Sequence, residues 1–377
     1  MLHFFASRLR QHAPNYRRVR KFGFSQVSHA PGGAGIGLVR GNVMGIDMKK
    51  MVLVAAMLAV TGSAFAADMP MKALKAPPPA PFDPWDIAFG GAIMSDYVFR
   101  GVTQSNHQPS VAAYFEPRYN VNKDLQLYVG TSAESISFAN RAAAEVDIYG
   151  GIRPTFGAAA FDFGIWGYLY PGGSCADNVI TPFGPGGGVC PVSTTTIFLA
   201  DGNVMKKNVS FFEAYGKLNY TINDNWTFGV NEYYSPNFLN SGAWGDYASI
   251  TAKYTAPSTV FGSSGVGMYV SGEFGRQFLG TSDAFYGVAG FPLGIKYADY
   301  NTWNIGIGFT YKVFTLDLRY SDTDLNKGNC NAFTSAFNAT GTTSVTPINP
   351  AGVGSNWCGA TGIAKLSFDL TAMTNLK

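Results

Sequence analysis

The chain has 377 residues, with 45 Gly, 55 aromatic residues and only 14% charged residues, a composition that excludes an intrinsically disordered protein. Its formal net charge of +3 combines two unlike parts, because residues 1–66 hold nine Lys or Arg and one acid, whereas residues 67–377 hold 18 basic and 23 acidic residues. The larger part therefore carries a net charge of −5, so no nucleic-acid partner is expected.

Residues 48–66 have the pattern of a secretory signal peptide. Two lysines precede Met51–Val60, an apolar run of ten residues, and a small-x-small cleavage pattern ends at Ala66. Cleavage between Ala66 and Ala67 is predicted, with export from the cytoplasm. Residues 1–47 are predicted to be a mis-called N-terminal extension, with the true start at residue 48; a functional basic extension or an organelle presequence is the alternative.

Residues 67–84 are rich in proline and are predicted to form a periplasmic linker between the cleavage site and the fold. After this linker, apolar and polar residues alternate from Trp85 to Leu370. Segments of roughly 9–11 residues recur with period 2, which is the pattern of tilted strands that cross a bilayer. In the second segment, Val111 and Phe115 share one face and Glu116 lies on the other.

Twelve such segments are present, and they predict an all-β fold, a transmembrane antiparallel β-barrel over residues 85–370 with a tail at residues 371–377. The first segment is expected to extend to Arg100, with Tyr97 and Phe99 on its apolar face. The later segments fall at about 208–220, 226–233, 246–254, 265–276, 301–311, 315–321 and 362–370.

The connections between segments alternate between short and long, and the long ones include three of more than 20 residues. Short periplasmic turns that alternate with long outer loops are typical of outer-membrane barrels. Aromatic residues at both ends of the segments predict two interfacial girdles. A secreted β-sandwich is the alternative, but it predicts neither the girdles nor the one-sided loop lengths.

All four cysteines lie in long loops on the same predicted side of the barrel. An even number of cysteines in an oxidising compartment predicts disulfides, and four cysteines allow three connectivities. Local pairing, Cys175 with Cys190 and Cys330 with Cys358, is preferred because it closes each long loop separately. No C-x-x-C is present, so no metal site is expected.

The charged residues of the polar face are predicted to line a lumen, because charge on a strand face inside hydrocarbon is costly. Eleven acids and seven bases share this face, which predicts a weak preference for cations. The candidate pore-lining residues are Asp96, Arg100, Glu116, Arg118, Glu134, Glu145, Asp147, Arg153, Asp162, Glu213, Lys217, Lys253, Glu273, Asp317 and Arg319.

A narrow pore constricted by an inward-folded loop is the preferred interpretation, and a plugged structural barrel is the alternative. An enzyme is not expected. His107 lies near Ser105 and Ser110, but such neighbours are common in loops, and no G-x-S-x-G is present. The Gly-rich segments lack the lysine and helix of a phosphate-binding loop, so no cofactor is expected.

Three blocks resemble a known family. Ser95–Ser105 (SDYVFRGVTQS) resembles the opening signature of the TorF family of porins, a proteobacterial outer-membrane family, and Glu145–Gly151 and Tyr168–Gly172 are similar to its next landmarks. The resemblance spans about residues 85–370. It implies a porin-like channel in the outer membrane and identifies no solute. The long cysteine-bracketed loops and the tail after the last strand depart from the family pattern.

The expected function is therefore passive diffusion of small polar solutes or ions through an outer-membrane channel. The alternative is a non-conducting structural or adhesive barrel with disulfide-closed surface loops. The expected partners are the lipid bilayer of the outer membrane, the transported solutes and the barrel-assembly machinery.

Overall fold

The computed structural model describes residues 84–376, apart from 175, 178–179, 182–183, 186–203, 289, 342–343 and 351. No helix in this part of the chain is long and apolar enough to cross a membrane. The predicted signal peptide, its cleavage site, the extension and most of the linker lie outside the described residues and stay predictions.

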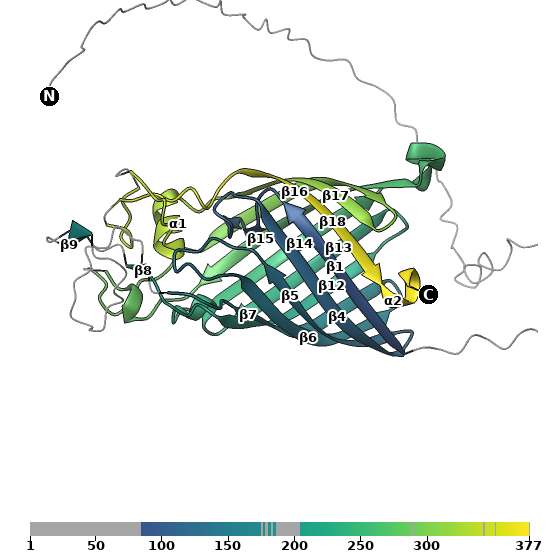
Figure 1. Cartoon of the computed structure of the whole chain (residues 1–377), viewed down its shortest axis with the longest axis horizontal. Helices are drawn as coiled ribbons and strands as arrows, with labels where there is room; N and C mark the ends of the chain where they lie inside the picture. Colours follow the sequence, from purple (N-terminus) through teal and green to yellow (C-terminus); the bar gives the residue numbers. More distant parts are fainter. Residues whose placement is uncertain are drawn as a thin grey trace, which may run out of the picture. The chain divides into compact units, whose positions relative to one another are not determined.

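Twelve antiparallel strands close into one barrel (Figure 1). Each strand pairs with its neighbours in the chain, and the first and last strands pair with each other, so the barrel has no free edge. The strands are β1 (Trp85–Met94), β4 (Ser110–Asn122), β5 (Leu125–Glu134), β6 (Glu145–Phe156), β7 (Ala159–Leu169), β12 (Phe211–Thr221), β13 (Trp226–Ser235), β14 (Gly245–Thr255), β15 (Val266–Leu279), β16 (Tyr300–Tyr311), β17 (Phe314–Thr323) and β18 (Thr361–Thr371). The predicted fold class and all twelve predicted strands are confirmed.

The outer face of the barrel is apolar. On successive strands, Ile93, Val111, Val129 and Ile148 are between 55% and 59% exposed, although an aliphatic side chain in a water-soluble domain is usually buried. Their neighbours along each strand point inward, as the period-2 pattern requires. This apolar band is the surface that faces lipid in membrane barrels.

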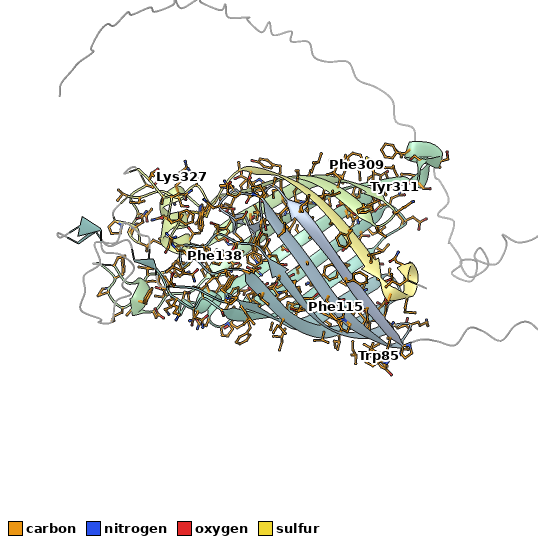
Figure 2. All side chains as sticks on the ribbon, viewed as in Figure 1. Trp85, Phe115, Phe138, Phe309, Tyr311 and Lys327 are labelled. Carbon is orange, nitrogen blue, oxygen red and sulfur yellow. A yellow bond between two sulfur atoms is a disulfide. The ribbon has the colours of Figure 1, made fainter. Side chains whose placement is uncertain are left out.

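The two ends of the barrel differ as predicted. Residues 123–124, 157–158, 222–225, 256–265 and 312–313 connect strands at one end. At the other end lie the described parts of segments 95–109, 135–144, 170–210, 236–244, 280–299 and 324–360, four of which are longer than any of these turns. Figure 2 shows Trp85 and Tyr311 at the end with the short turns, and Phe138 and Lys327 at the end with the long loops. Trp85 is 62% exposed and packs edge-on against Tyr119, with ring centroids 4.9 Å apart, as an interfacial girdle requires.

The first predicted segment is too long. Strand β1 ends at Met94, and the chain then leaves the wall, so Tyr97 and Phe99 do not join the outer girdle. Tyr97 instead donates a hydrogen bond to Glu145 on the inner face of β6, at 2.6 Å. The alternation persists past Met94 because the next residues form a second, shorter β-structure, which has the same period.

Inside the barrel, tyrosine rings lie over glycines of the neighbouring strand. Tyr149 faces Gly130, and Tyr269 faces Gly308, and a Cβ atom at either glycine would overlap the ring. Glycine is therefore required at these inward positions so that the ring can lie against the backbone. The hydroxyl of Tyr269 then reaches the carboxylate of Asp317 on β17, at 2.7 Å.

The long loops carry the remaining elements. The last loop contains α1 (Lys327–Thr334), and the predicted Cys330–Cys358 disulfide is confirmed within it. Cys175 and Cys190 lie outside the described residues, so their pairing stays a prediction. The other elements are β2 (Val98–Phe99), β3 (Val102–Thr103), β8 (Ala176–Asp177), β9 (Ile180–Thr181), β10 (Gly184–Pro185), β11 (Val204–Met205), η1 (Phe238–Asn240), η2 (Ser258–Ser264), η3 (Ala284–Tyr286) and α2 (Ala372–Asn375).

Candidate pore: the lumen and its first loop

The first long loop, residues 95–109, folds into the barrel. Strands β2 and β3 pair as a short hairpin, and Arg100 and Gly101 form its turn, with φ angles of +48° and +77°. Two consecutive positive φ angles are the pattern of a type I′ turn, which favours glycine at its second position. The hairpin therefore presents the side chain of Arg100 at its tip.

Arg100 crosses the lumen to the opposite wall. Its two Nη atoms donate to the two carboxylate oxygens of Glu213 on β12, at 2.8 and 2.7 Å, and Nη1 also donates to Gln277 on β15, at 3.1 Å. The side chains of Arg100 and Glu213 are only 5% and 0% exposed. The guanidinium also lies 4.4 Å from the ring centroid of Tyr247, which adds a cation–π contact. This two-pronged, buried pair holds the hairpin across the barrel.

Asp96 anchors the base of the same loop. Its carboxylate accepts hydrogen bonds from Thr103 at 2.5 Å and Ser105 at 3.0 Å, and it lies 2.6 Å from Nδ1 of His107. Burial pushes the pKa of Asp96 up, but the hydrogen bonds and the charge of His107 outweigh burial and hold that pKa below its ordinary value. The hydroxyl of Ser105 is thus bonded to Asp96 and is not directed at the imidazole.

His107 joins the first loop to the last. Its Nε2 lies 2.8 Å from the backbone oxygen of Asn356, so both ring nitrogens face oxygen acceptors. An imidazole satisfies two acceptors only when it is protonated. The hydrogen bond to Asp96 accordingly raises the pKa of His107, against the opposing effect of burial. Val102 also forms an isolated β-bridge with Cys358, next to the disulfide.

Four predicted lumenal residues form one charge network on the wall from β4 to β7. Glu116 accepts from Arg118 at 2.6 Å and from Arg153 at 2.8 Å. Arg153 also reaches Asp162 at 3.3 Å, and its guanidinium lies 3.6 Å from the ring centroid of Tyr128. Opposite charges on β4, β6 and β7 therefore neutralise one another along this wall.

A second network lies on β14 to β17. Arg319 donates to both carboxylate oxygens of Asp317, at 3.0 Å each. Glu273 accepts from Tyr247 at 3.0 Å and from Asn304 at 3.3 Å. This wall holds fewer ion pairs than the first one and more uncharged donors.

A cavity of about 270 Å³ lies between the hairpin and this second wall. Its lining includes Arg100 and Gly101 at the hairpin tip, with Glu273, Asn304 and Arg319 from the strands. The side chains of the lumen therefore leave room for several water molecules beside the hairpin.

The remaining candidates also lie on the inner face. Glu134, Glu145 and Asp147 each place a carboxylate oxygen within 4.8 Å of the other two. Lys217 lies 4.4 Å from the ring centroid of Tyr215, and Lys253 lies 4.5 Å from that of Tyr269.

Sequence reasoning missed the lumenal partners that carry no charge. Gln277, which binds the hairpin tip, and the inward tyrosines share the parity of the predicted pore-lining residues. The same alternation would have found them if uncharged polar side chains had been included.

Residues 79–184 match the model of a family described as a bacterial protein of unknown function, Gcw_chp. The matched range contains all three blocks that resemble the TorF family, and that finer resemblance stays an interpretation. No curated protein matches the chain.

Several solved structures match the chain over about three quarters of its length. The COG4313 outer membrane channel from Pseudomonas putida F1 has a TM-score of 0.40 at 9% identity, with 79% of this chain and 100% of that chain covered. A loop-deletion mutant of OmpT, an outer membrane protein of Vibrio cholerae, has a TM-score of 0.31 at 12% identity, with coverage of 76% and 100%. LpxR from Salmonella typhimurium has a TM-score of 0.34 at 8% identity, with coverage of 75% and 99%.

Proposed function

We propose that the protein is an outer-membrane channel through which small polar solutes diffuse passively, with a weak preference for cations. The observation that carries the proposal is the lumen itself, which is lined by charged and polar side chains and retains a cavity of about 270 Å³ beside the hairpin tip. The apolar outer band and the predicted signal peptide support insertion into the outer membrane by the barrel-assembly machinery.

In this proposal the hairpin of the first loop is the constriction. No covalent bond among the described residues holds it in the lumen; its tip is fixed by the Arg100–Glu213 pair. Separating the two partners of a buried ion pair is costly as long as the charges stay buried, because neither charge is then compensated. We therefore expect a channel that is closed most of the time and opens briefly.

Single-channel recording in planar bilayers tests the proposal. Arg100→Ala removes the side chain that crosses the lumen, so the open probability should rise at least tenfold over that of the unmodified protein. Arg276→Ala is the matched control, because Arg276 is an exposed arginine on β15 that has the outward parity of its neighbour Phe274. This control should leave the open probability unchanged.

A non-conducting structural or adhesive barrel is the second candidate, and the complete burial of Glu213 favours it. The two candidates differ in one result. If Arg100→Ala is folded, as judged by heat-modifiable gel mobility, and shows no channel steps, the structural barrel is the better assignment.

A further inference from the structure

Three carboxylates converge on the inner wall at the base of the hairpin. Glu134 ends β5 and is paired directly with Glu145 at the start of β6, and Asp147 follows two residues later on the same face. One carboxylate oxygen from each lies within 4.8 Å of the other two. Strand register therefore brings three carboxyl groups into one place.

No basic side chain among the described residues forms an ion pair with this triad. Two lumenal arginines are engaged elsewhere, Arg100 with Glu213 and Arg153 with Glu116 and Asp162. This distinguishes the triad from the lumenal acids that are paired. Buried carboxylates without a compensating positive charge are costly, so the triad needs a cation or bound protons.

Uncharged donors satisfy only part of the triad. Glu145 is 2% exposed and accepts hydrogen bonds from Tyr97 at 2.6 Å and Tyr170 at 2.8 Å. Asp147 is 3% exposed and accepts from Ser132 through Oδ2 at 2.9 Å.

Two oxygens of the triad stay without a partner. Oδ1 of Asp147 and Oε2 of Glu134 are inaccessible to solvent and form no hydrogen bond. The indole N–H of Trp166 is the donor next to the carboxylate of Asp147, but it does not reach that carboxylate with ordinary hydrogen-bond geometry. Buried, unpaired oxygens beside a surplus of negative charge are the arrangement that an ion completes.

We propose that Glu134, Glu145 and Asp147 bind one divalent cation of the oxygen-preferring class, for which Ca²⁺ is the best-fitting ion. Two oxygens that each lie 2.3–2.6 Å from a shared Ca²⁺ are at most about 5 Å apart, and the triad falls within this limit. The triad offers only oxygen ligands. Hard cations prefer oxygen ligands, whereas softer metals prefer thiolate or imidazole ligands. Mg²⁺ fits less well because it demands octahedral geometry at shorter distances.

The site would also bear on the first loop, since Tyr97 precedes β2 and hydrogen-bonds Glu145. The bound cation would fix Glu145 and, through it, the base of the hairpin. Binding itself does not depend on whether the barrel conducts, so it can be measured separately from the channel proposal.

The test uses the chain purified from membranes, treated with EGTA and held in detergent at neutral pH. Tb³⁺, an oxygen-preferring ion of nearly the same size as Ca²⁺, is titrated while its luminescence is excited through nearby tyrosine and tryptophan. We expect saturation at one ion per chain and displacement by Ca²⁺ at concentrations at least tenfold lower than by Mg²⁺. Isothermal titration with Ca²⁺ alone should give the same stoichiometry.

Variants separate this site from adventitious binding by lipid or other acids. Glu134→Gln changes the least buried of the three acids, and it should weaken Ca²⁺ binding at least tenfold. Glu273→Gln is the matched control, a lumenal acid on β15 outside the triad, and should leave binding unchanged. Asp147→Asn provides a second variant if Glu134→Gln is not folded by gel mobility. Absence of saturable binding by the folded chain, or equal binding by Glu134→Gln and Glu273→Gln, would overturn the proposal in favour of carboxylates that hold protons.

Discussion

The imidazole of His107 makes the contact between the first and last loops dependent on pH. Because its hydrogen bond to Asp96 raises the pKa of His107 against the effect of burial, the folded protein binds this proton more tightly than the unfolded chain does. The stabilisation is fully present below the unfolded pKa of about 6.5 and is lost as the pH rises through the higher folded pKa. Asp96 sets the opposite limit: its pKa is lowered, so its contribution is lost as the pH falls through that lowered pKa.

This can be measured directly, because the other three histidines, His3, His12 and His29, precede the predicted cleavage site. The single histidine signal of the mature chain in an NMR pH titration should have its midpoint above 6.5. Asp96→Asn removes the negative charge but keeps an acceptor, so it should lower the midpoint. A wild-type midpoint at or below the ordinary value would contradict the contact seen here.

The ring of Tyr269 fits inside the barrel only because residue 308 is a glycine and has no Cβ atom. Gly308→Ala would place a Cβ atom inside the ring of Tyr269, so the ring must move and lose its hydrogen bond to Asp317. Overpacking of this kind costs about 1–3 kcal/mol. The temperature at which the folded gel form converts to the unfolded form should therefore fall.

Gly362→Ala is the matched control, because no atom lies within 4 Å of a Cβ built at Gly362. It should leave the conversion temperature unchanged, and Gly308→Ala combined with Tyr269→Ala should lose most of the added strain. An equal effect of Gly308→Ala and Gly362→Ala would show that the ring contact is unimportant.

At the scale of elements, alternation predicts a strand and its two faces but does not say where the chain leaves the wall. The pattern located all twelve strands because lipid on one side and a polar lumen on the other impose period 2 on every strand. It placed Tyr97 and Phe99 on the outside because the hairpin that follows β1 has the same period. The signal for the departure is local: Gly101 after Arg100 permits the positive φ angles of a tight turn.

The same limit applies to the candidate pore. Parity placed the charged residues on the inner face, but it could not pair Arg100 with Glu213, which lie 113 residues apart in the chain. Nor could it reveal that Glu134, Glu145 and Asp147 form no ion pair with any basic side chain in the described part of the chain. Pairing depends on strand register and on the fold of the first loop, and neither follows from composition or period.

The Cys330–Cys358 disulfide fixes the last loop rather than the barrel. Its two cysteines are 28 residues apart, and closing a loop of this length contributes about 3–4 kcal/mol in the chain-entropy model. C330S/C358S should therefore loosen residues 324–360 and leave the strands paired. Trypsin cleavage after the exposed Lys327 should accelerate at least tenfold, as measured by mass spectrometry of timed digests.

Cleavage after Lys123, which lies in a short turn with its side chain 87% exposed, is the internal control and should not change. A similar acceleration at both lysines would mean that the disulfide supports the whole barrel. No change at Lys327 would mean that the contacts of α1 hold the loop without the disulfide.

For the whole molecule, closure of twelve strands removes every free edge among them and leaves the interior to decide function. That interior is divided: one wall is neutralised by arginine–carboxylate networks, and the cavity lies against the other wall. Between them stands the hairpin, held at its tip by Arg100. The electrostatic field that acts on a solute in the lumen would therefore be set by the few charges that are not fully paired.

Ion selectivity of the proposed channel tests this view. Glu116 is shared by Arg118 and Arg153, so Arg118→Ala leaves the acid with one partner and makes the lumen more negative, whereas Glu116→Gln leaves two arginines and makes it more positive. One unit charge at about 8 Å in water contributes about 0.5 kcal/mol, or about twofold in local ion concentration. Reversal potentials in a salt gradient should thus show cation preference rising about twofold in Arg118→Ala and falling about twofold in Glu116→Gln. The outward Arg276→Ala should leave the reversal potential unchanged.

Shifts of the same sign in both lumenal variants would place the ion path away from this wall. Potentials identical to those of the unmodified protein in both variants would mean that ions do not pass through the barrel interior.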